Sequence, residues 1–261
     1  MPGPRDPARI HVMAAGFFAD PAHAGLFLDF DGTLAPIVAD PALARLGPRA
    51  RGALHGLTPR YAVVAVLSGR SLDDLSGRVD VPGLWLSGGH GRAIRAPNGS
   101  TRVAQIGPDA PDRLARAEAA VGQLSPAIRI ERKPASIAFH YRGQEGDAAL
   151  VAELTARVRA AAEPLGLVAA PGRCLVELRL PGVDKGVALR TIVAETGVGA
   201  IGVAGDDWTD LDAFRAARSL PGCLALTVAA RGAETPPALL AEADLILEGV
   251  DGVVEWLERL L

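Results

Sequence analysis

Lysine is almost absent from this chain. Of its 27 basic residues, 25 are arginine, and only Lys133 and Lys185 are lysine. An ammonium is a compact point charge and a guanidinium is a planar fork, so the two are not interchangeable. A chain that uses arginine nearly everywhere therefore predicts a specific need for an ammonium at these two positions. The alternative is chance.

Cysteine and long apolar runs are also scarce. Cys174 and Cys223 lie far apart and match no disulfide or metal-binding pattern. The longest aliphatic stretches, such as residues 61–67, fall short of the roughly 18 residues that a membrane span requires. Residues 1–18 contain no basic flank followed by an apolar segment, so we expect no signal peptide. These absences predict a reduced, cytoplasmic protein without a membrane partner.

The chain also lacks an excess of one charge. Its net charge is −3, and its 261 residues are 49% apolar and 22% charged. Disordered chains have few apolar residues and a high net charge, so the composition excludes that class. Dedicated nucleic-acid binders are basic, so the near-neutral charge argues against that function. The length suits one large domain, or one domain that carries a smaller one. We take a monomer as the default.

Apolar runs alternate with amphipathic helical stretches over both ends of the chain. The runs do not alternate apolar with polar residues, which is typical of parallel strands covered on both faces. We therefore predict an α/β core. Its expected strands are 25–30, 61–67, 84–87, 200–204, 224–228 and 245–247, and its expected helices are 49–57, 71–79, 185–195, 209–217 and 253–261.

The middle of the chain has a different pattern. Two helices are expected there, and three strands alternate apolar with charged residues, which is typical of an antiparallel sheet with one wet face. Glu177 and Arg179 lie two apart on one of these strands and so share a face. We predict a small α+β domain at 106–181, inserted into a core of 1–105 and 182–261. The expected helices are 112–124 and 147–162, and the expected strands are 128–132, 136–142 and 173–180.

Polar side chains follow several of the predicted parallel strands. In open α/β sheets, ligands bind beyond the carboxyl ends of the strands. Asp29 and Asp31 lie two apart and therefore point the same way, and Asp206 follows a later strand. Neighbouring carboxylates repel each other unless a cation lies between them, and an all-oxygen site suits Mg²⁺. The alternative for residues 31–33 is an ordinary Asp-Gly turn.

Two further residues are candidates for phosphate or carboxylate binding. Ser68 follows a strand, where its hydroxyl could bind a phosphoryl oxygen or cap helix 71–79, although Ser71 or Asp73 could cap it equally well. Lys185 begins a helix, where the helix dipole disfavours a cation, so we expect an anionic partner. The alternative is a solvated lysine. Among the aspartates around position 206, we expect at least one to cap the following helix.

The order of these motifs resembles a known superfamily. Four short segments resemble, in order, the four motifs of the haloacid dehalogenase-like phosphatases. They are DFDGT at 29–33, SGR at 68–70, DKG at 184–186 and GDDWTD at 205–210. Within that superfamily, four further segments resemble those of the trehalose-6-phosphate phosphatase family. They are ERK at 131–133, HYR at 140–142, VELR at 176–179 and GGHG at 88–91. The resemblance implies a Rossmann-like parallel-sheet core with an inserted α+β cap.

The resemblance also implies an activity, namely Mg²⁺-dependent hydrolysis of trehalose 6-phosphate to trehalose and phosphate. Three segments depart from the family pattern. The family usually has an acidic residue shortly after the HG pair, where this chain has Arg92–Arg95. Its last motif usually reads TDED, where this chain has Leu211 after Asp210, and its ELR segment usually continues directly into proline, whereas here Leu180 precedes Pro181. The alternatives are therefore a phosphatase for sucrose 6-phosphate, a glycosyl-phosphoglycerate or a sugar monophosphate, a phosphomutase, and a binding protein without catalysis.

Roles for individual residues follow from the resemblance. Asp29 is implied to be the nucleophile that forms an aspartyl-phosphate, and Asp31 the general acid and then base. Lys185 and Ser68 are implied to stabilise and position the phosphoryl group. Mg²⁺ is implied to be held by Asp29, the backbone carbonyl of Asp31, and Asp206.

Auxiliary and substrate-binding roles complete the expected site. Asp207 and Asp210 are implied to be auxiliary acidic residues. The residues implied to bind the sugar phosphate are Gly32, Thr33, Gly69, Arg70, His90, Glu131, Lys133, His140, Arg142 and Glu177. His140 is equally well explained as a sheet histidine with satisfied hydrogen bonds, and Arg142 and Arg179 as exposed residues in weak ion pairs.

Overall fold

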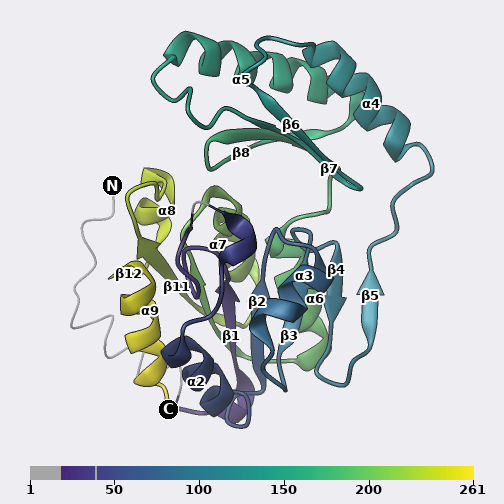
Figure 1. The fold of residues 1–261 in the computed structure, drawn as a ribbon. Coiled ribbons are helices and arrows are strands. Elements are labelled where there is room, and N and C mark those ends of the chain that lie inside the picture. Colours follow the sequence, from purple (N-terminus) through teal and green to yellow (C-terminus); the bar gives the residue numbers. More distant parts are fainter. Residues whose placement is uncertain (1–18, 39) are drawn as a thin grey trace. The chain divides into compact units, whose positions relative to one another are not determined.

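The computed structural model describes residues 19–38 and 40–261, and it divides into two compact units (Figure 1). The core unit comprises Met1–Val103 and Asp184–Leu261, and the cap unit comprises Ala104–Val183. These boundaries lie two residues from those expected for the inserted domain. Residues 1–18, for which no signal peptide is expected, lie outside the described residues.

An eight-stranded sheet forms the centre of the core unit. Its order is β12-β11-β10-β1-β2-β3-β4-β5, and the pairs from β12 through β3 are parallel. The strands are β1 (Ala24–Asp29), β2 (Val63–Leu67), β3 (Trp85–Gly88), β4 (Ala93–Arg95), β5 (Thr101–Val103), β10 (Ala200–Gly205), β11 (Leu224–Arg231) and β12 (Leu245–Glu248).

One edge of this sheet differs from the prediction. Strands β4 and β5 are antiparallel to their neighbours, whereas a wholly parallel sheet was expected. Each has only three residues, and neither contains an apolar run, so the sequence carries no strand signal there. The tight turn at Asn98–Ser100 that joins them, rather than hydrophobic periodicity, determines this hairpin.

Helices cover both faces of the sheet. Leu26 and Leu28 of β1 pack with three helices, and Phe27 points to the opposite face and packs with three others. The first set is α2 (Pro48–Leu57), α3 (Leu72–Val79) and α9 (Gly249–Glu258), and the second is α6 (Lys185–Thr196), α7 (Trp208–Ser219) and α8 (Pro237–Glu242). Burial on both faces explains why these strands are continuously apolar, and it confirms the expected α/β core.

The strand order reverses at β1. The chain proceeds from β1 to β2 on one side, and β10 pairs with β1 on the other. In register, Asp29 pairs with Leu67, and Leu28 pairs with Ala204. The carboxyl ends of these three strands therefore lie side by side, at the position where open α/β sheets bind ligands.

The cap unit has its own sheet and its own apolar core. Its antiparallel order is β6-β7-β9-β8, with β6 (Arg129–Lys133), β7 (Ser136–His140), β8 (Val168–Gly172) and β9 (Leu175–Arg179). Ile137, Phe139 and Leu178 pack against α4 (Ala110–Val121) and α5 (Ala148–Ala162). Strand β8 was not expected, because its sequence VAAPG has neither alternation nor bulky residues. Short 3₁₀ helices occur at Pro21–His23, Pro41–Leu43 and Glu163–Leu165.

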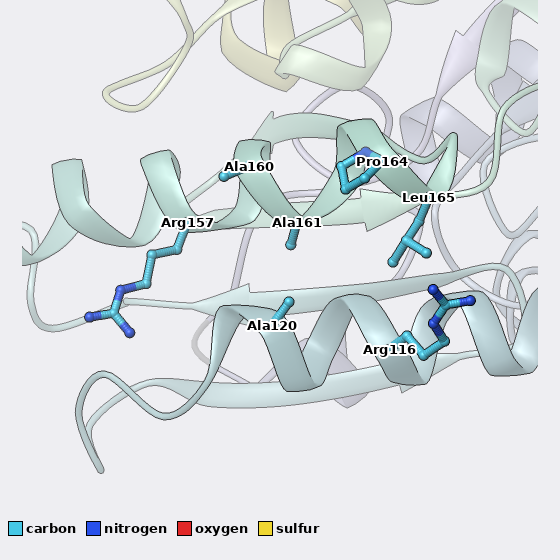
Figure 2. Close-up of a pocket in the computed structure, with 7 residues that line it drawn as sticks. All are labelled: Arg116, Ala120, Arg157, Ala160, Ala161, Pro164 and Leu165. Carbon is cyan, nitrogen blue, oxygen red and sulfur yellow. The ribbon is translucent and has the colours of Figure 1, made fainter.

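A groove of about 380 Å³ lies between α4 and α5 (Figure 2). Arg116 and Arg157 flank small side chains such as Ala120 and Ala161. No residue expected to bind substrate lines it. Across residues 19–38 and 40–261, every helix is too short or too polar to cross a bilayer.

Candidate active site

Three buried carboxylates meet at the carboxyl ends of the central strands. Asp29 ends β1, Asp206 follows β10, and Asp210 lies in the first turn of α7. Each contributes an oxygen to a group whose atoms lie within 4.8 Å of one another. The sequence predicted Asp29 and Asp206 as metal ligands and Asp210 as an auxiliary residue, and the structure brings all three together.

Lys185 is the ammonium that faces this cluster. Its Nζ donates to Asp29 Oδ1 at 2.5 Å and to Asp210 Oδ1 at 2.7 Å, and the side chain is 3% exposed. It is the first residue of α6, which Asp184 caps by accepting from the Val187 N–H. The expectation of an anionic partner is confirmed, and the partners are carboxylates. The alternative of a solvated lysine is wrong.

Asp210 also holds the loop that carries Asp206 in place through backbone hydrogen bonds. Its Oδ2 accepts from the backbone N–H groups of Asp206 and Asp207, both at 3.0 Å. Asp207 caps α7, and the two aspartates form a reciprocal capping box. The expectation that one of these aspartates is a helix cap is therefore confirmed. Because both oxygens of Asp210 are engaged, it is better suited to positioning the loop than to binding metal.

The electrostatics of the cluster favour a cation. Burial raises the pKa of Asp29, Lys185 opposes that rise, and Asp210 and Asp206 add to it. Burial alone would lower the pKa of Lys185, but Asp210 and Asp29 outweigh it and keep the ammonium protonated. The cluster thus contains three carboxylates and one ammonium, which bonds to Asp29 and Asp210. This surplus of negative charge and the all-oxygen donor set fit a hard divalent cation, for which Asp29 and Asp206 are the expected side-chain ligands.

The turn after β1 brings the backbone close to Asp206. Gly32 has φ +93°, and a Cβ there would lie 2.0 Å from Asp206 Oδ2. Only glycine satisfies both the conformation and the contact. Thr33 is fully buried, and its hydroxyl has no hydrogen-bond partner among residues 19–38 and 40–261.

Ser68 follows β2 and is 1% exposed. Its Oγ accepts from the Arg70 N–H at 3.2 Å, so its own hydroxyl hydrogen is directed elsewhere. The cap of α3 is Ser71, whose Oγ accepts from the Asp74 N–H, and not Ser68. The capping interpretation of Ser68 is therefore wrong, and its role as a hydroxyl donor to a phosphoryl oxygen stays a prediction.

His90 lies against the same turn. It has φ +55° and is flanked by Gly89 and Gly91, which also have positive φ. Its N–H donates to the Ser68 carbonyl, and its ring lies so close to Gly69 that a Cβ there would be 2.4 Å from Cε1. The GGHG segment thus supports the Ser68–Arg70 turn through its backbone and the His90 ring.

Asp31 lies next to the cluster and has a cation of its own. Arg70 Nε donates to Asp31 Oδ2 and Arg70 Nη2 to Asp31 Oδ1, each at 2.7 Å. The Asp31 side chain is 35% exposed and that of Arg70 is 13% exposed. Arg70, expected to bind substrate, therefore contacts the residue expected to act as acid and base.

The cap sheet gathers most of the other expected residues on one face. Glu131, Ala138 and Glu177 are paired in register across β6, β7 and β9. Lys133, Ser136 and Arg179 form the next row on the same face. The apolar residues at the intervening positions pack on α4 and α5. Ser136 and Ala138 were not named from sequence, although the two-residue alternation with His140 was a usable signal.

Hydrogen bonds fix the acidic groups on this polar face. His140 Nε2 and Glu131 Oε2 lie 2.9 Å apart, and Lys133 Nζ lies 3.8 Å from Glu131 Oε1. The hydrogen bond from His140, with a smaller contribution from Lys133, lowers the pKa of Glu131 to about 2. Ser136 Oγ donates to Glu177 Oε1 at 2.7 Å.

The two cap arginines interpreted from the sequence as exposed differ from each other. Arg142 lies in the turn after β7 and is exposed, outside the two rows of the polar face. Arg179 is 8% exposed, so its interpretation as an exposed ion-pairing residue is wrong.

Comparisons with known proteins point to one family. The sequence model described as trehalose-phosphatase matches residues 27–236. A trehalose-phosphate phosphatase of Mycobacterium avium is 42% identical over 212 residues, which is 76% of this chain and 52% of that protein. The chain thus spans about half the length of this curated relative.

Solved structures show the same fold. The C-terminal domain of Candida albicans trehalose-6-phosphate phosphatase superposes with a TM-score of 0.74 at 22% identity, covering 95% of each chain. Trehalose-6-phosphate phosphatase of Aspergillus fumigatus superposes with a TM-score of 0.72 at 25% identity, covering 98% of this chain and 97% of that one. A haloacid dehalogenase-like hydrolase from Bacteroides thetaiotaomicron, at 18% identity and a TM-score of 0.62, shares this fold.

Proposed function

Because the chain belongs to the trehalose-phosphatase family, we propose that it hydrolyses trehalose 6-phosphate to trehalose and inorganic phosphate. The observation that carries the proposal is the buried group of Asp29, Asp206, Asp210 and Lys185 at the carboxyl ends of the central strands. A binding protein without catalysis has no need for a carboxylate paired to a buried ammonium beside a second, oriented carboxylate.

Asp29 is assigned as the nucleophile. Its Oδ1 accepts from Lys185, which leaves Oδ2 to attack phosphorus. As the new O–P bond forms, the P–O bond to the sugar breaks, and the sugar oxygen takes a proton from Asp31. A water molecule then attacks phosphorus, Asp31 takes its proton, and the bond to Asp29 breaks. Atoms and protons balance over the two steps.

The other core residues serve the phosphoryl group. Lys185 offsets negative charge beside Asp29, and the Ser68 hydroxyl donates to a phosphoryl oxygen. Asp29, Asp206 and the backbone carbonyl of Asp31 are the proposed ligands of Mg²⁺, with Asp210 and Asp207 positioning their loop. The ion, when bound, supplies positive charge that lets an anionic nucleophile approach an anionic phosphate.

The polar face of the cap sheet is the proposed sugar-binding surface. A disaccharide presents many hydroxyl groups, so its recognition requires fixed acceptors and donors together. Glu131 and Glu177 supply acceptors, and Lys133 supplies a donor, with His140 orienting Glu131. The lowered pKa of Glu131 keeps it an ionised acceptor even well below the physiological pH range.

Phosphate release from a panel of sugar phosphates tests the proposal. The panel sets trehalose 6-phosphate beside sucrose 6-phosphate, glucose 6-phosphate and a glycosyl-phosphoglycerate, each with Mg²⁺ and with EDTA. Asp29→Asn is the blank, and Asp73→Asn, whose side chain is 98% exposed in the native protein, is the matched control. We expect trehalose 6-phosphate to have the highest kcat/KM, with the blank reduced about a thousandfold or more.

The panel separates two ways in which the proposal fails. A different preferred sugar phosphate contradicts the assigned substrate but leaves the core mechanism. An Asp29→Asn protein as active as wild type contradicts the mechanism itself. A requirement for a sugar bisphosphate activator identifies a phosphomutase instead.

A further inference from the structure

Arg70 holds the carboxylate of Asp31 by both oxygens. The two N–H groups that donate, Nε and Nη2, each lie 2.7 Å from a different oxygen of Asp31. This is the bidentate arrangement in which a planar guanidinium determines the position and the plane of a carboxylate. A lysine could not do this, because its ammonium has no fixed fork.

Arg70 is itself fixed from several directions. Its Nη1 donates to Asp74 Oδ2 at 2.9 Å, and its Nη2 also donates to the carbonyl of Pro41 at 2.9 Å. Its guanidinium carbon lies 5.5 Å from the centre of the Phe30 ring. Its backbone N–H donates to Ser68 Oγ, and its carbonyl accepts from Gly89. An arginine held in this way keeps its position when its partner moves, unlike an ordinary surface ion pair.

The site thus contains two separate carboxylate–cation sets. Lys185 serves Asp29 and Asp210, and Arg70 serves Asp31 and Asp74. The buried cluster has three carboxylates and one ammonium, and among residues 19–38 and 40–261 the ion pair recorded for Asp31 is the one with Arg70. The separation keeps the proposed acid–base residue oriented independently of the nucleophile.

We propose that Arg70 is the positioning residue of Asp31, and that it acts on catalysis through Asp31 rather than through contact with substrate. The inference rests on the proposed function.

The dependence of rate on the leaving group tests this role. Sugar phosphates require a proton on their leaving oxygen, whereas 4-nitrophenyl phosphate does not, because 4-nitrophenolate is a stable anion. The value of kcat/KM reports only the steps up to the first irreversible one. That step is the transfer of the phosphoryl group to Asp29, so kcat/KM does not include the later attack of water, in which Asp31 acts as a base. We expect Arg70→Met to lower kcat/KM for trehalose 6-phosphate about 100-fold or more, and for 4-nitrophenyl phosphate less than about tenfold.

Arg78 supplies a matched control. It donates to Asp74 Oδ1 through Nε and Nη2, so it shares the carboxylate that holds Arg70, whereas its Nη1 donates to the backbone carbonyls of Ala42 and Ala44. We expect Arg78→Lys to leave the ratio of the two kcat/KM values at the wild-type level. We expect Arg70→Lys, which retains the charge and folds without a buried gap, to give a ratio between wild type and Arg70→Met.

A double-mutant cycle completes the test. If Arg70 acts through Asp31, Arg70→Met causes no further change of the ratio in an Asp31→Asn background. Equal losses for both substrates, or full additivity with Asp31→Asn, would show that Arg70 contacts the phosphoryl group, and either result overturns the inference. If wild type instead prefers another sugar phosphate, the proposed function fails, and the same ratio is measured with that substrate.

Discussion

At the scale of single residues, Asp206 and Asp210 lie four positions apart and have different tasks. Asp210 uses both oxygens on Lys185 and on the backbone of its own loop, whereas Asp206 lies against Gly32 at the centre of the site. A short acidic motif therefore contains one proposed metal ligand and one residue that holds the ligand in place. Residue type alone does not separate them.

This difference predicts opposite responses to metal. We expect Mg²⁺ to raise the Tm of wild type and EDTA to abolish activity, because a bound ion stabilises the folded state. In Asp206→Asn the Mg²⁺-dependent rise of Tm should vanish. In Asp210→Asn the protein should lose about 3–5 kcal/mol of stability in EDTA, because Lys185 loses a buried partner, yet retain a rise with Mg²⁺. Thermal unfolding with and without Mg²⁺ measures both, and identical behaviour of the two variants would contradict the distinction.

Glu131 predicts a pH dependence of stability. Its pKa lies at about 2 in the folded protein, below its usual 4.5, through the hydrogen bond from His140. A lowered pKa contributes stability that is complete above about pH 4.5 and is lost as the pH falls towards 2. We expect Glu131→Gln to reduce the loss of stability between pH 5 and pH 2.5 in urea unfolding. Glu153→Gln, on helix α5, should retain the wild-type slope, and equal slopes in all three proteins would refute the assignment.

At the scale of elements, the start of α6 depends on the loop after β3. Asp184 caps α6, and Lys185 is its first residue. Gly91 has φ +97°, and a Cβ there would lie 2.3 Å from the carbonyl oxygen of Asp184. Two segments far apart in sequence thus meet at the point that positions the ammonium.

Two glycine substitutions separate strain from contact. Gly99 also has positive φ, +86°, but a Cβ there would meet nothing within 4 Å. We expect Gly99→Ala to cost about 1–2 kcal/mol through backbone strain alone and to retain full activity. Gly91→Ala should cost about 2 kcal/mol more, because the Asp184 carbonyl must move, and should lower kcat by displacing Lys185. Urea unfolding and kcat measure these effects, and equal results for the two variants would contradict the proposed contact.

At the scale of the whole molecule, the chain consists of two units with separate cores. Within the part of the chain that the structure describes, the apolar core of the cap unit is made of residues from that unit, between Ile106 and Val183. Its four strands pair with one another, and α4 and α5 cover the sheet. The proposed chemistry belongs to the core unit and the proposed sugar recognition to the cap unit.

The separate core predicts that the cap unit folds alone. We expect a fragment of residues 104–183 to unfold cooperatively on heating, with a stability of only a few kcal/mol because of its size. Circular dichroism against temperature measures this. As a control, Phe139→Ala, which removes a fully buried ring, should abolish the transition. A fragment without a cooperative transition would show that the cap requires the core in order to fold.

Local sequence patterns were enough to predict most of the elements and the chemical groups of the site. Continuous apolar runs predicted the buried strands, helix-start residues predicted the caps, and the order of short motifs predicted the family and the residues Asp29, Asp31, Lys185 and Asp206. These signals are local: each depends on neighbours within a few positions, through strand or helix periodicity and capping. The hairpin of β4 and β5, and strand β8, were missed because they lack such a local signal.

Which groups face each other could be learned only from the folded chain. Lys185 and Asp29 lie 156 positions apart, and Arg70 and Asp31 lie 39 apart, so their pairing depends on strand order and on how strand ends meet. The same holds for the row of Glu131, Ala138 and Glu177, which follows from the register of three strands. The physical reason is that the charge and shape of a side chain depend on a single residue, whereas the distance between two residues far apart in sequence depends on how the whole chain folds.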